Sequence, residues 1–546
     1  MENGKKCLAI ELLYFFFLAA LTAAAGAYYH GNNEEMSFLF VQIISCFALC
    51  LVLFKTGESL LQIISAHPHW GRWSSLFAYS KKNIVCISAF LFSIYFVYLL
   101  IRFPGVCGAD TVNQITDLVT GSAPLAESGT KGRMEISALL NDHHPVLTTL
   151  VFTLFYRFGQ LIGNPNWGMF FYNLIQIVIL AILFAVIICS MDRYHIPRPV
   201  ALFSLFFYAS PVIASFAVSM LKDSLFSLFF VLYYISFINC VMSAKDLEPG
   251  HRGSWTKLIL YSVLIALLNK KGMYLVLFSN SCLLILQRGK KRLHALVSVL
   301  LPVFVIVIFL GKILFPLLNI YPGGKQEALG FAFQQTALAM IEKPESFTKE
   351  ETDVFFSILE LSREELPDVY DPGSVDAIKS FFNDAAADKL LLTYLKQWAA
   401  HFFKTPISYI RATLSVNGGF IAPVKSHNLY RQVHWNASIQ AFYQPARLAF
   451  ARDFADQAIT WFMNIPLMSA LSQDSLYMFG FPSFSFYVFC KKKQWKNLVF
   501  LSPMLANLLF LLMGPICWTR YGLCQLYTFP LLLALTAQTT HVEIVQ

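Results

Sequence analysis

Long apolar segments separated by short basic loops are the feature that most constrains how this chain of 546 residues can fold. A helix needs about 20 predominantly apolar residues to cross a bilayer. Hydrophobic residues make up 57% of the chain and charged residues only 13%, whereas soluble domains carry about 25% charge. The sequence therefore predicts an all-α polytopic membrane protein.

About twelve spanning helices and one further apolar helix are predicted. The spans are 8–29, 36–54, 83–103, 167–190, 199–218, 222–243, 257–268, 272–287, 294–315, 469–490, 496–514 and 519–538. The pair 257–268 and 272–287 is short enough to form a hairpin that does not fully cross. Residues 146–164 form the further helix, and its placement decides the topology.

Basic residues predict the orientation, because Lys and Arg gather in cytoplasmic loops. If 146–164 crossed fully, the basic clusters at 288–292 and 491–493 would face outward. If it lies in the interface or re-enters the outer leaflet, they face inward. We therefore predict an interfacial helix, a multi-pass protein of the cell membrane with cytoplasmic N- and C-termini, and an external working face. The net charge of +9 then indicates contact with membrane lipid and no nucleic-acid partner.

Four parts follow from this topology. They are two N-terminal spanning helices with a cytoplasmic linker (1–82), a transmembrane core (83–315) that contains the first external loop (104–145), an external domain (316–468) and C-terminal transmembrane helices (469–546). The third part lacks a convincing span and holds 16 of the 32 acidic residues. It is predicted to be mostly helical, with amphipathic helices over 347–361 and 374–398 that Thr348 and Ser374 cap.

Candidate chemical groups cluster in the first external loop, at Asp110, Gln114, Asp142, His143 and His144. A carboxylate just outside a membrane helix is partly desolvated, so it can act as a general base or hold a cation. Asp142 and the two histidines offer an acid/base pair or ligands for a divalent cation. The alternative interpretation is that Asp110 caps a short helix and His144 merely precedes a turn-forming proline.

Cationic groups in three predicted external turns come to the same face. With their neighbours they are Lys222 and Asp223, Lys270 and Lys271, and Arg520 and Tyr521. The positive-inside rule disfavours Lys and Arg in such turns, and a phosphate in the headgroup region would explain them, because Arg binds it as a fork and Lys as a point charge. The alternative is that each side chain only extends to lipid headgroups.

These motifs resemble the GT-C integral membrane glycosyltransferases, the superfamily of protein O-mannosyltransferases and aminoarabinose transferases. The chain more closely resembles an uncharacterised bacterial branch with a Pro-Gly…Asp…Gln first loop, a His-His-Pro helix start, a Lys-Asp turn and a late Arg-Tyr. The resemblance places the superfamily's essential acidic residue at Asp110 and its Lys-Gly hairpin tip at Lys271. The usual acidic pair is a lone Asp110 here, which leaves metal dependence and the role of Asp142 open.

The resemblance implies a glycosyltransferase that moves a sugar from a polyprenyl-phosphate donor to an acceptor at the external face. Asp110 would accept the proton of the acceptor hydroxyl. The departing phosphate would be stabilised by cations, namely Lys222, Lys270 or Lys271, and Arg520. A transporter or flippase of a lipid-linked sugar or anion, and a polysaccharide polymerase or ligase, are the alternatives.

Overall fold

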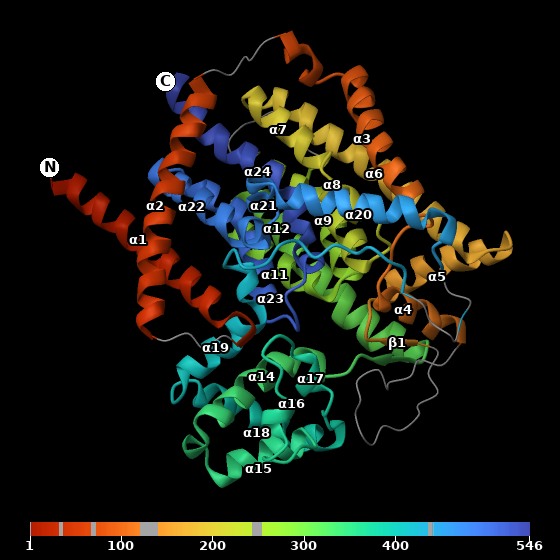
Figure 1. The fold of residues 1–546 in the computed structure, drawn as a ribbon, viewed down its shortest axis with the longest axis vertical. Helices are drawn as coiled ribbons and strands as arrows, with labels where there is room; N and C mark the ends of the chain where they lie inside the picture. The colour runs from red at the N-terminus through yellow and green to blue at the C-terminus, as the bar shows by residue number, and fades with distance from the viewer. Residues whose placement is uncertain are drawn as a thin grey trace.

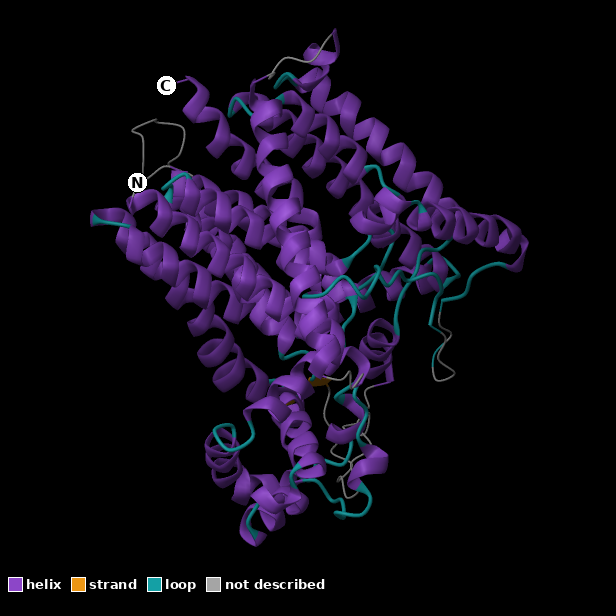
Figure 2. Cartoon of the chain, turned by 60° about the vertical axis from the view of Figure 1, so that its left-hand side comes forward, coloured by secondary structure: helices purple, strands orange, loops and turns teal. Residues whose placement is uncertain are grey.

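The computed structural model describes residues 2–31, 36–66, 72–120, 140–242, 254–434, 439 and 442–545. These residues fold almost entirely as helices (Figure 2), so the prediction of an all-α protein is confirmed. Apart from isolated bridges, the only strands among these residues are β1 (Leu140–Asp142) and β2 (Ile320–Pro322), which pair in parallel. Residues 121–139 of the predicted first external loop lie outside the described part.

Most helices form a membrane body with a smaller helical unit at one end (Figure 1). The body contains α1 (Glu2–Tyr28), α2 (Met36–Ala66), α3 (Lys81–Ile101), α4 (Ala109–Thr120), α5 (Val146–Leu161), α6 (Pro165–Arg193), α7 (Arg198–Tyr208), α8 (Pro211–Ala217), α9 (Lys222–Met242), α10 (Ser254–Leu268), α11 (Lys270–Leu286), α12 (Gly289–Val303), a π-helical continuation (Phe304–Leu314), α13 (Phe315–Leu317), α20 (Ala449–Asn464), α21 (Pro466–Leu471), α22 (Phe481–Lys491), α23 (Ser502–Leu512) and α24 (Thr519–Val545).

Seven helices in the described residues are long and apolar enough to cross a membrane. They are Leu8–Gly31, Phe38–Ala66, Lys81–Ile101, Pro165–Arg193, Lys222–Met242, Gly289–Leu317 and Trp495–Leu512. The pair α7 and α8, bent by 56°, would make an eighth. A multi-pass membrane protein is thus supported, but twelve crossings are not.

The remaining predicted spans differ from an unbroken crossing for local reasons. The helices α10 and α11 have 15 and 17 residues, fewer than the about 20 that a crossing typically needs. The segment 469–490 is divided among α21, a π turn over Leu476–Gly480 and α22. The last helix, α24, is long but carries Arg520 and several amide and hydroxyl side chains.

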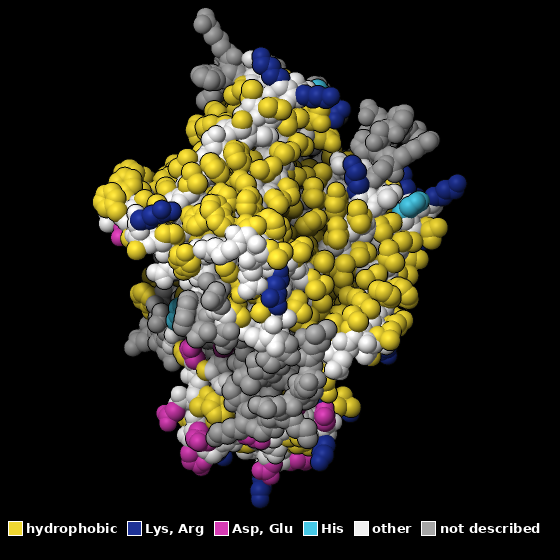
Figure 3. All heavy atoms as spheres, turned by 90° about the vertical axis from the view of Figure 1, so that its right-hand side faces the viewer, with side chains coloured by type: hydrophobic (Ala, Val, Ile, Leu, Met, Phe, Trp, Pro, Cys, Tyr) yellow, Lys and Arg dark blue, Asp and Glu magenta, His cyan; other side chains and the backbone are white. Residues whose placement is uncertain are grey.

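The smaller unit, residues 326–401, is here called the acidic subdomain. Its helices are α14 (Gln326–Glu342), α15 (Lys349–Ile358), α16 (Leu366–Val369), α17 (Asp376–Lys379) and α18 (Asp384–His401). They pack around Phe333, Phe355 and Tyr394. Figure 3 shows acidic side chains gathered at this end, below the broad apolar surface of the membrane body.

The predicted external domain 316–468 has two parts in the structure. After the acidic subdomain, α19 (Pro406–Asn417) leads back toward the membrane body. The amide of His434 then donates to the carbonyl of Cys107 at 3.2 Å. In α20, Asp456 pairs with the buried Arg102 at the end of α3, and Figure 1 shows α20 lying across the membrane body.

A glycine allows α10 and α11 to form a close hairpin. Asn269 caps α11, its side-chain oxygen accepting from the amide of Lys271 at 3.2 Å. A Cβ at Gly272 would lie 2.1 Å from the carbonyl oxygen of Ile265. The Gly272→Ala variant should therefore lose about 1–3 kcal/mol of stability through overpacking, measured as a lower thermal unfolding midpoint in detergent.

The matched control is Gly480→Ala, since a Cβ there would lie 3.5 Å from its nearest backbone oxygen, an ordinary contact. Its unfolding midpoint should stay close to that of the wild type. Equal midpoints for both variants would show that the hairpin relaxes without cost.

Candidate functional site

Three helices begin where the membrane body meets the acidic subdomain, and each brings a charged residue in its first turn. Asp110 lies in α4, Lys222 and Asp223 in α9, and Arg520 in α24. The positive end of a helix dipole favours acidic residues and disfavours basic ones. Lys222 and Arg520 therefore need nearby negative charge.

Asp110 supplies that charge to both cations. Its Oδ2 lies 3.1 Å from Nζ of Lys222 and 3.1 Å from Nη1 of Arg520. Burial raises the pKa of the Asp110 carboxyl, but the two cations outweigh this effect and hold the pKa well below its usual range. Asp110 is therefore ionised at neutral pH.

A second carboxylate lies on the other side of Arg520. Asp223 is only 1% exposed, and its Oδ2 is 3.8 Å from Nε of Arg520. Its Oδ1 accepts from the side-chain amide of Asn269 at 3.0 Å. The guanidinium thus lies between two acidic side chains, and α9, α24 and the α10–α11 turn meet around it.

Aromatic rings hold the guanidinium in place. Its carbon is 4.7 Å from the ring centre of Trp518, 4.8 Å from that of Tyr521 and 5.8 Å from that of Tyr430. Nη2 of Arg520 donates to the Tyr521 hydroxyl at 2.9 Å. Such contacts favour the cation. Trp518 and Tyr430 were not predicted, although the aromatic residues flanking Arg520 in sequence were a usable signal.

The two histidines of the first loop are neutral at neutral pH. Nδ1 of His144 is 3.0 Å from Nζ of Lys222; burial and the lysine charge hold the pKa of His144 well below its usual value. Burial, with the charges of Lys222 and Lys270, lowers the pKa of His143 to about 4 despite the nearby Glu327. Both imidazoles are therefore uncharged, and each can donate one hydrogen bond and accept another.

Asp142 lies apart from Asp110, at the strand pair. Its Oδ2 is 3.7 Å from Nζ of Lys270, and burial raises its pKa despite that lysine. Asp142 also ends β1, which pairs with β2 just before the acidic subdomain (Figure 2). A Cβ on Gly323 would meet the Asp142 carbonyl at 2.7 Å, so only glycine fits beside this strand.

A cavity of about 360 Å³ connects these groups with the acidic subdomain. Glu327 and Lys379 form the wall on the side of the acidic subdomain. Burial raises the pKa of the Glu327 carboxyl, but the charge of Lys379 outweighs this effect, so the net pKa is lowered and Glu327 is ionised. The cavity is lined by Asp110, Asp117, Asn141, His143, His144, Lys222, Gly323, Gly324, Gln326, Glu327, Asp376, Lys379, Ser380, Pro515, Ile516, Trp518, Arg520 and Tyr521.

Four of the residues predicted to bind substrate do not line the cavity, namely Gln114, Asp223, Lys270 and Lys271; Lys270 lines a neighbouring apolar groove instead. The side-chain oxygen of Gln114 accepts from the hydroxyls of Thr148 and Thr149 at 2.8 and 3.2 Å, which joins α4 to α5. Lys271 is 2% exposed and donates to the backbone oxygen of Tyr521. Through these contacts, Gln114 and Lys271 hold in place the helices that carry the residues lining the cavity.

A buried network behind Arg520 was not predicted. Nδ1 of His427 lies 2.6 Å from Oδ1 of Asp474, and Oδ2 of Asp474 accepts from the Thr519 hydroxyl at 2.8 Å. The same hydroxyl accepts from the amide of Asn428 at 2.6 Å. The network fixes the first residue of α24, which is next to Arg520. The sequence carried no local signal for it because its members are far apart in the chain.

A divalent cation finds no ready ligand set in this arrangement. Among the described residues, no three His, Cys, Asp or Glu side chains gather in a way that would hold a metal ion. Asp110 and Asp142 already contact lysine or arginine, which a divalent cation would have to displace.

A family profile described as "Family of unknown function (DUF6020)" matches residues 7–545. Since this match covers nearly the whole chain, the protein belongs to that family. No curated protein and no solved structure matches the chain. The resemblance to GT-C glycosyltransferases therefore remains a prediction.

The neutral histidines predict a pH dependence of stability. Because the pKa of His143 is about 4 and that of His144 is also depressed, the unfolded chain binds more protons than the folded one below about pH 6.5. Stability should be full above this value and fall as the pH approaches 4. The double variant His143→Asn, His144→Asn should show a smaller fall in unfolding midpoint between pH 7.5 and 4.5.

His294→Asn is the control, since this histidine is exposed in α12. It should retain the pH dependence of the wild type. Identical profiles for the wild type and the double variant would contradict a neutral pair of histidines.

Proposed function

We propose that this member of the family is a membrane glycosyltransferase that takes a sugar from a polyprenyl-phosphate donor. The observation that carries the proposal is the convergence of Lys222 and Arg520 on one carboxylate oxygen, in a polar cavity beside an apolar groove. A substrate with a phosphate, a sugar and a long apolar chain matches this pair of hollows.

The apolar groove has a volume of about 480 Å³ and lies beside α5, the α10–α11 turn and the helix that continues α12. Apolar side chains such as Leu267, Met273 and Leu310 dominate its lining, and Asp142 and Lys270 supply its only charges among the described residues. Asn141 and His143 line the polar cavity while Asp142, between them, lines the groove. The two hollows therefore meet at β1, so a donor whose phosphate lies near Lys222 and Arg520 would extend its tail past β1 into the groove.

In the proposed reaction the acceptor oxygen forms a bond to the anomeric carbon. The bond from that carbon to the phosphate oxygen breaks, and polyprenyl phosphate leaves with the bonding electron pair. Lys222 and Arg520 stabilise the charge that develops on the leaving phosphate. Asp110 receives the proton of the acceptor hydroxyl.

Donor binding would make Asp110 a better base. In the free site two cations hold its pKa well below the usual range, so it binds protons weakly. A donor phosphate near Lys222 and Arg520 would offset their charge and raise the pKa of the carboxyl toward the value that proton transfer requires.

The orientation and the number of crossings are part of the proposal. Twelve crossings with both termini in the cytoplasm would put the acidic subdomain and the cavity outside. Basic clusters near Arg288 and Lys491, at other helix ends, support this arrangement through the positive-inside rule.

One observation favours the transporter alternative. The Tyr487 hydroxyl contacts Glu11 at 2.6 Å and Glu58 at 3.1 Å, and both carboxylates also pair with lysines, Lys55 and Lys491. Ionisable groups within spanning helices often mark ion pathways. A polymerase or ligase would instead require a donor that carries an assembled glycan.

Turnover of radiolabelled polyprenyl-phosphate hexoses by purified protein tests the enzyme and its residues. The wild type should release polyprenyl phosphate, and Asp110→Asn should lower kcat by about 10²-fold or more. Arg520→Gln should cost about 10²–10³-fold. The acid limb of kcat should lie at a higher pH than that of kcat/KM, because donor binding raises the pKa of Asp110.

Asp388→Asn, an exposed carboxylate of α18, should retain full turnover as the control. Equal release by the wild type and Asp110→Asn would remove Asp110 as the base. Binding of a donor without any release would favour the transporter.

The groove predicts a dependence on donor chain length. Leu310→Trp should fill part of the groove and raise KM severalfold for a long-chain donor, with little effect on a donor whose lipid is too short to reach it. Leu301→Trp, exposed on the preceding turns of the same helix and outside the groove lining, is the control. A KM that rises equally for both donors would place the lipid elsewhere.

A further inference from the structure

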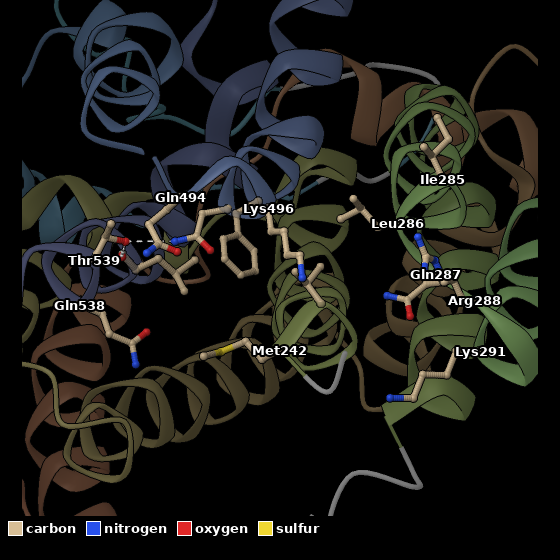
Figure 4. A pocket seen from close by; sticks show the side chains of 14 residues that line it. Met242, Ile285, Leu286, Gln287, Arg288, Lys291, Gln494, Lys496, Gln538 and Thr539 are labelled. Carbon is tan, nitrogen blue, oxygen red and sulfur yellow. Dashed lines mark hydrogen bonds between the residues drawn. The ribbon is translucent and has the colours of Figure 1, made fainter. Parts of the chain in front are cut away.

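A third hollow lies near the ends of α9 and α24 that are opposite to the candidate site. Lys222 begins α9 and Met242 ends it, and at 1.5 Å per residue these 21 residues span about 30 Å. Likewise, Arg520 begins α24, whereas Gln538 and Thr539 lie near its other end. The hollow has a volume of about 800 Å³ and opens between two walls (Figure 4).

The charges that line this hollow are all positive. Arg288 and Lys291 come from the start of α12, and Lys496 comes from the 3₁₀ segment Trp495–Leu501 on the other wall. No Asp or Glu is among the described residues that line it. Figure 4 shows Lys496 on one wall facing Gln287 and Lys291 on the other across the space between them.

Gln287 gives an independent indication of a ligand. Its side chain is 3% exposed, and its Nε2 has no hydrogen-bond partner among the described residues. A buried donor without an acceptor is costly, and this one lies on the wall of the hollow. An acceptor oxygen bound there would satisfy it. Amides on the opposite wall, such as Gln494, add further donors.

Apart from the charged residues, the amides and Thr539, the lining is apolar. Leu286, Phe500 and Leu535 are among the residues that complete the hollow. A neighbouring hollow of about 570 Å³ shares Met242, Leu535 and Gln538 with it. That hollow adds Arg193 and Lys257, again with no acidic residue in its described lining. A ligand for this region carries negative charge and an apolar part.

We propose that this hollow binds the phosphate group of an anionic phospholipid from the adjacent leaflet. Arg288, Lys291 and Lys496 contact the phosphate, and the Gln287 amide donates to one of its oxygens. The upper part of the acyl chains packs on the apolar lining. The site is separate from the proposed donor site and does not depend on the glycosyltransferase proposal.

Native mass spectrometry of the full chain in a neutral detergent, titrated with phosphatidylglycerol, measures this binding. The wild type should bind the lipid saturably. The triple variant Arg288→Gln, Lys291→Gln, Lys496→Gln should bind it at least tenfold more weakly, and Gln287→Leu severalfold more weakly. The control Lys290→Gln, Arg292→Gln removes charges from exposed neighbours in α12 that do not line the hollow, and should match the wild type.

Phosphatidylcholine and glycerol 3-phosphate distinguish the sources of the phosphate. Weaker binding of both supports an anionic lipid. Glycerol 3-phosphate that binds as tightly as the lipid, and is lost in the triple variant, would overturn the lipid as the source of the phosphate. Equal weakening in the triple variant and the control would overturn the site itself, as would a wild type without saturable binding.

Discussion

The contact of Lys222 and Arg520 with one oxygen of Asp110 is the interaction on which the site depends. Both cations occupy the first turn of a helix, where the helix dipole disfavours positive charge. The carboxylate compensates them and joins α4, α9 and α24 at one point. Buried contacts behind two of these helices hold this arrangement: Gln114 fixes α4 against α5, and the Asp474–Thr519 contact fixes the start of α24.

The sequence assigned these residues to one face through charge asymmetry and the parity of helices, and in the structure Asp110, Lys222 and Arg520 lie together. The sequence did not predict which side chains point into the cavity. A helix such as α9 is apolar all round, so its sequence has no polar stripe that would fix its rotation. Lys222 lines the cavity, whereas Lys271, in the first turn of α11, turns inward to the backbone of Tyr521.

The same limit applies to the breaks within apolar segments. Average hydropathy predicts one span over 199–218. In the structure Ser210 caps a new helix that begins at Pro211, and α7 and α8 are bent by 56° relative to each other. In the acidic subdomain, Thr348 forms the predicted cap of α15, with Glu351 completing a capping box. The helix expected from Ser374 is interrupted, and Asn383 caps the longer part instead. A capping residue can be recognised from the local sequence, but the long-range contact at Asn383 cannot: its backbone amide donates to the carbonyl of Ile358 at 2.8 Å.

The charges around Asp110 would change during cleavage of a phosphodiester donor. Lys222, Arg520, Asp110 and Asp223 carry equal numbers of positive and negative charges, and His144 beside them is neutral. Cleavage would turn the single charge of the donor phosphate into the nearly double charge of a phosphate monoester. A proton accepted by Asp110 removes one negative charge from the cluster at the same moment. The cluster would then become positive as the leaving group becomes more negative, while the rings of Trp518 and Tyr521 keep Arg520 in place. Cations that are already oriented need no reorganisation in that step. Asp110 would therefore have two roles: it accepts the proton, and it neutralises Lys222 and Arg520 until the phosphate takes its place.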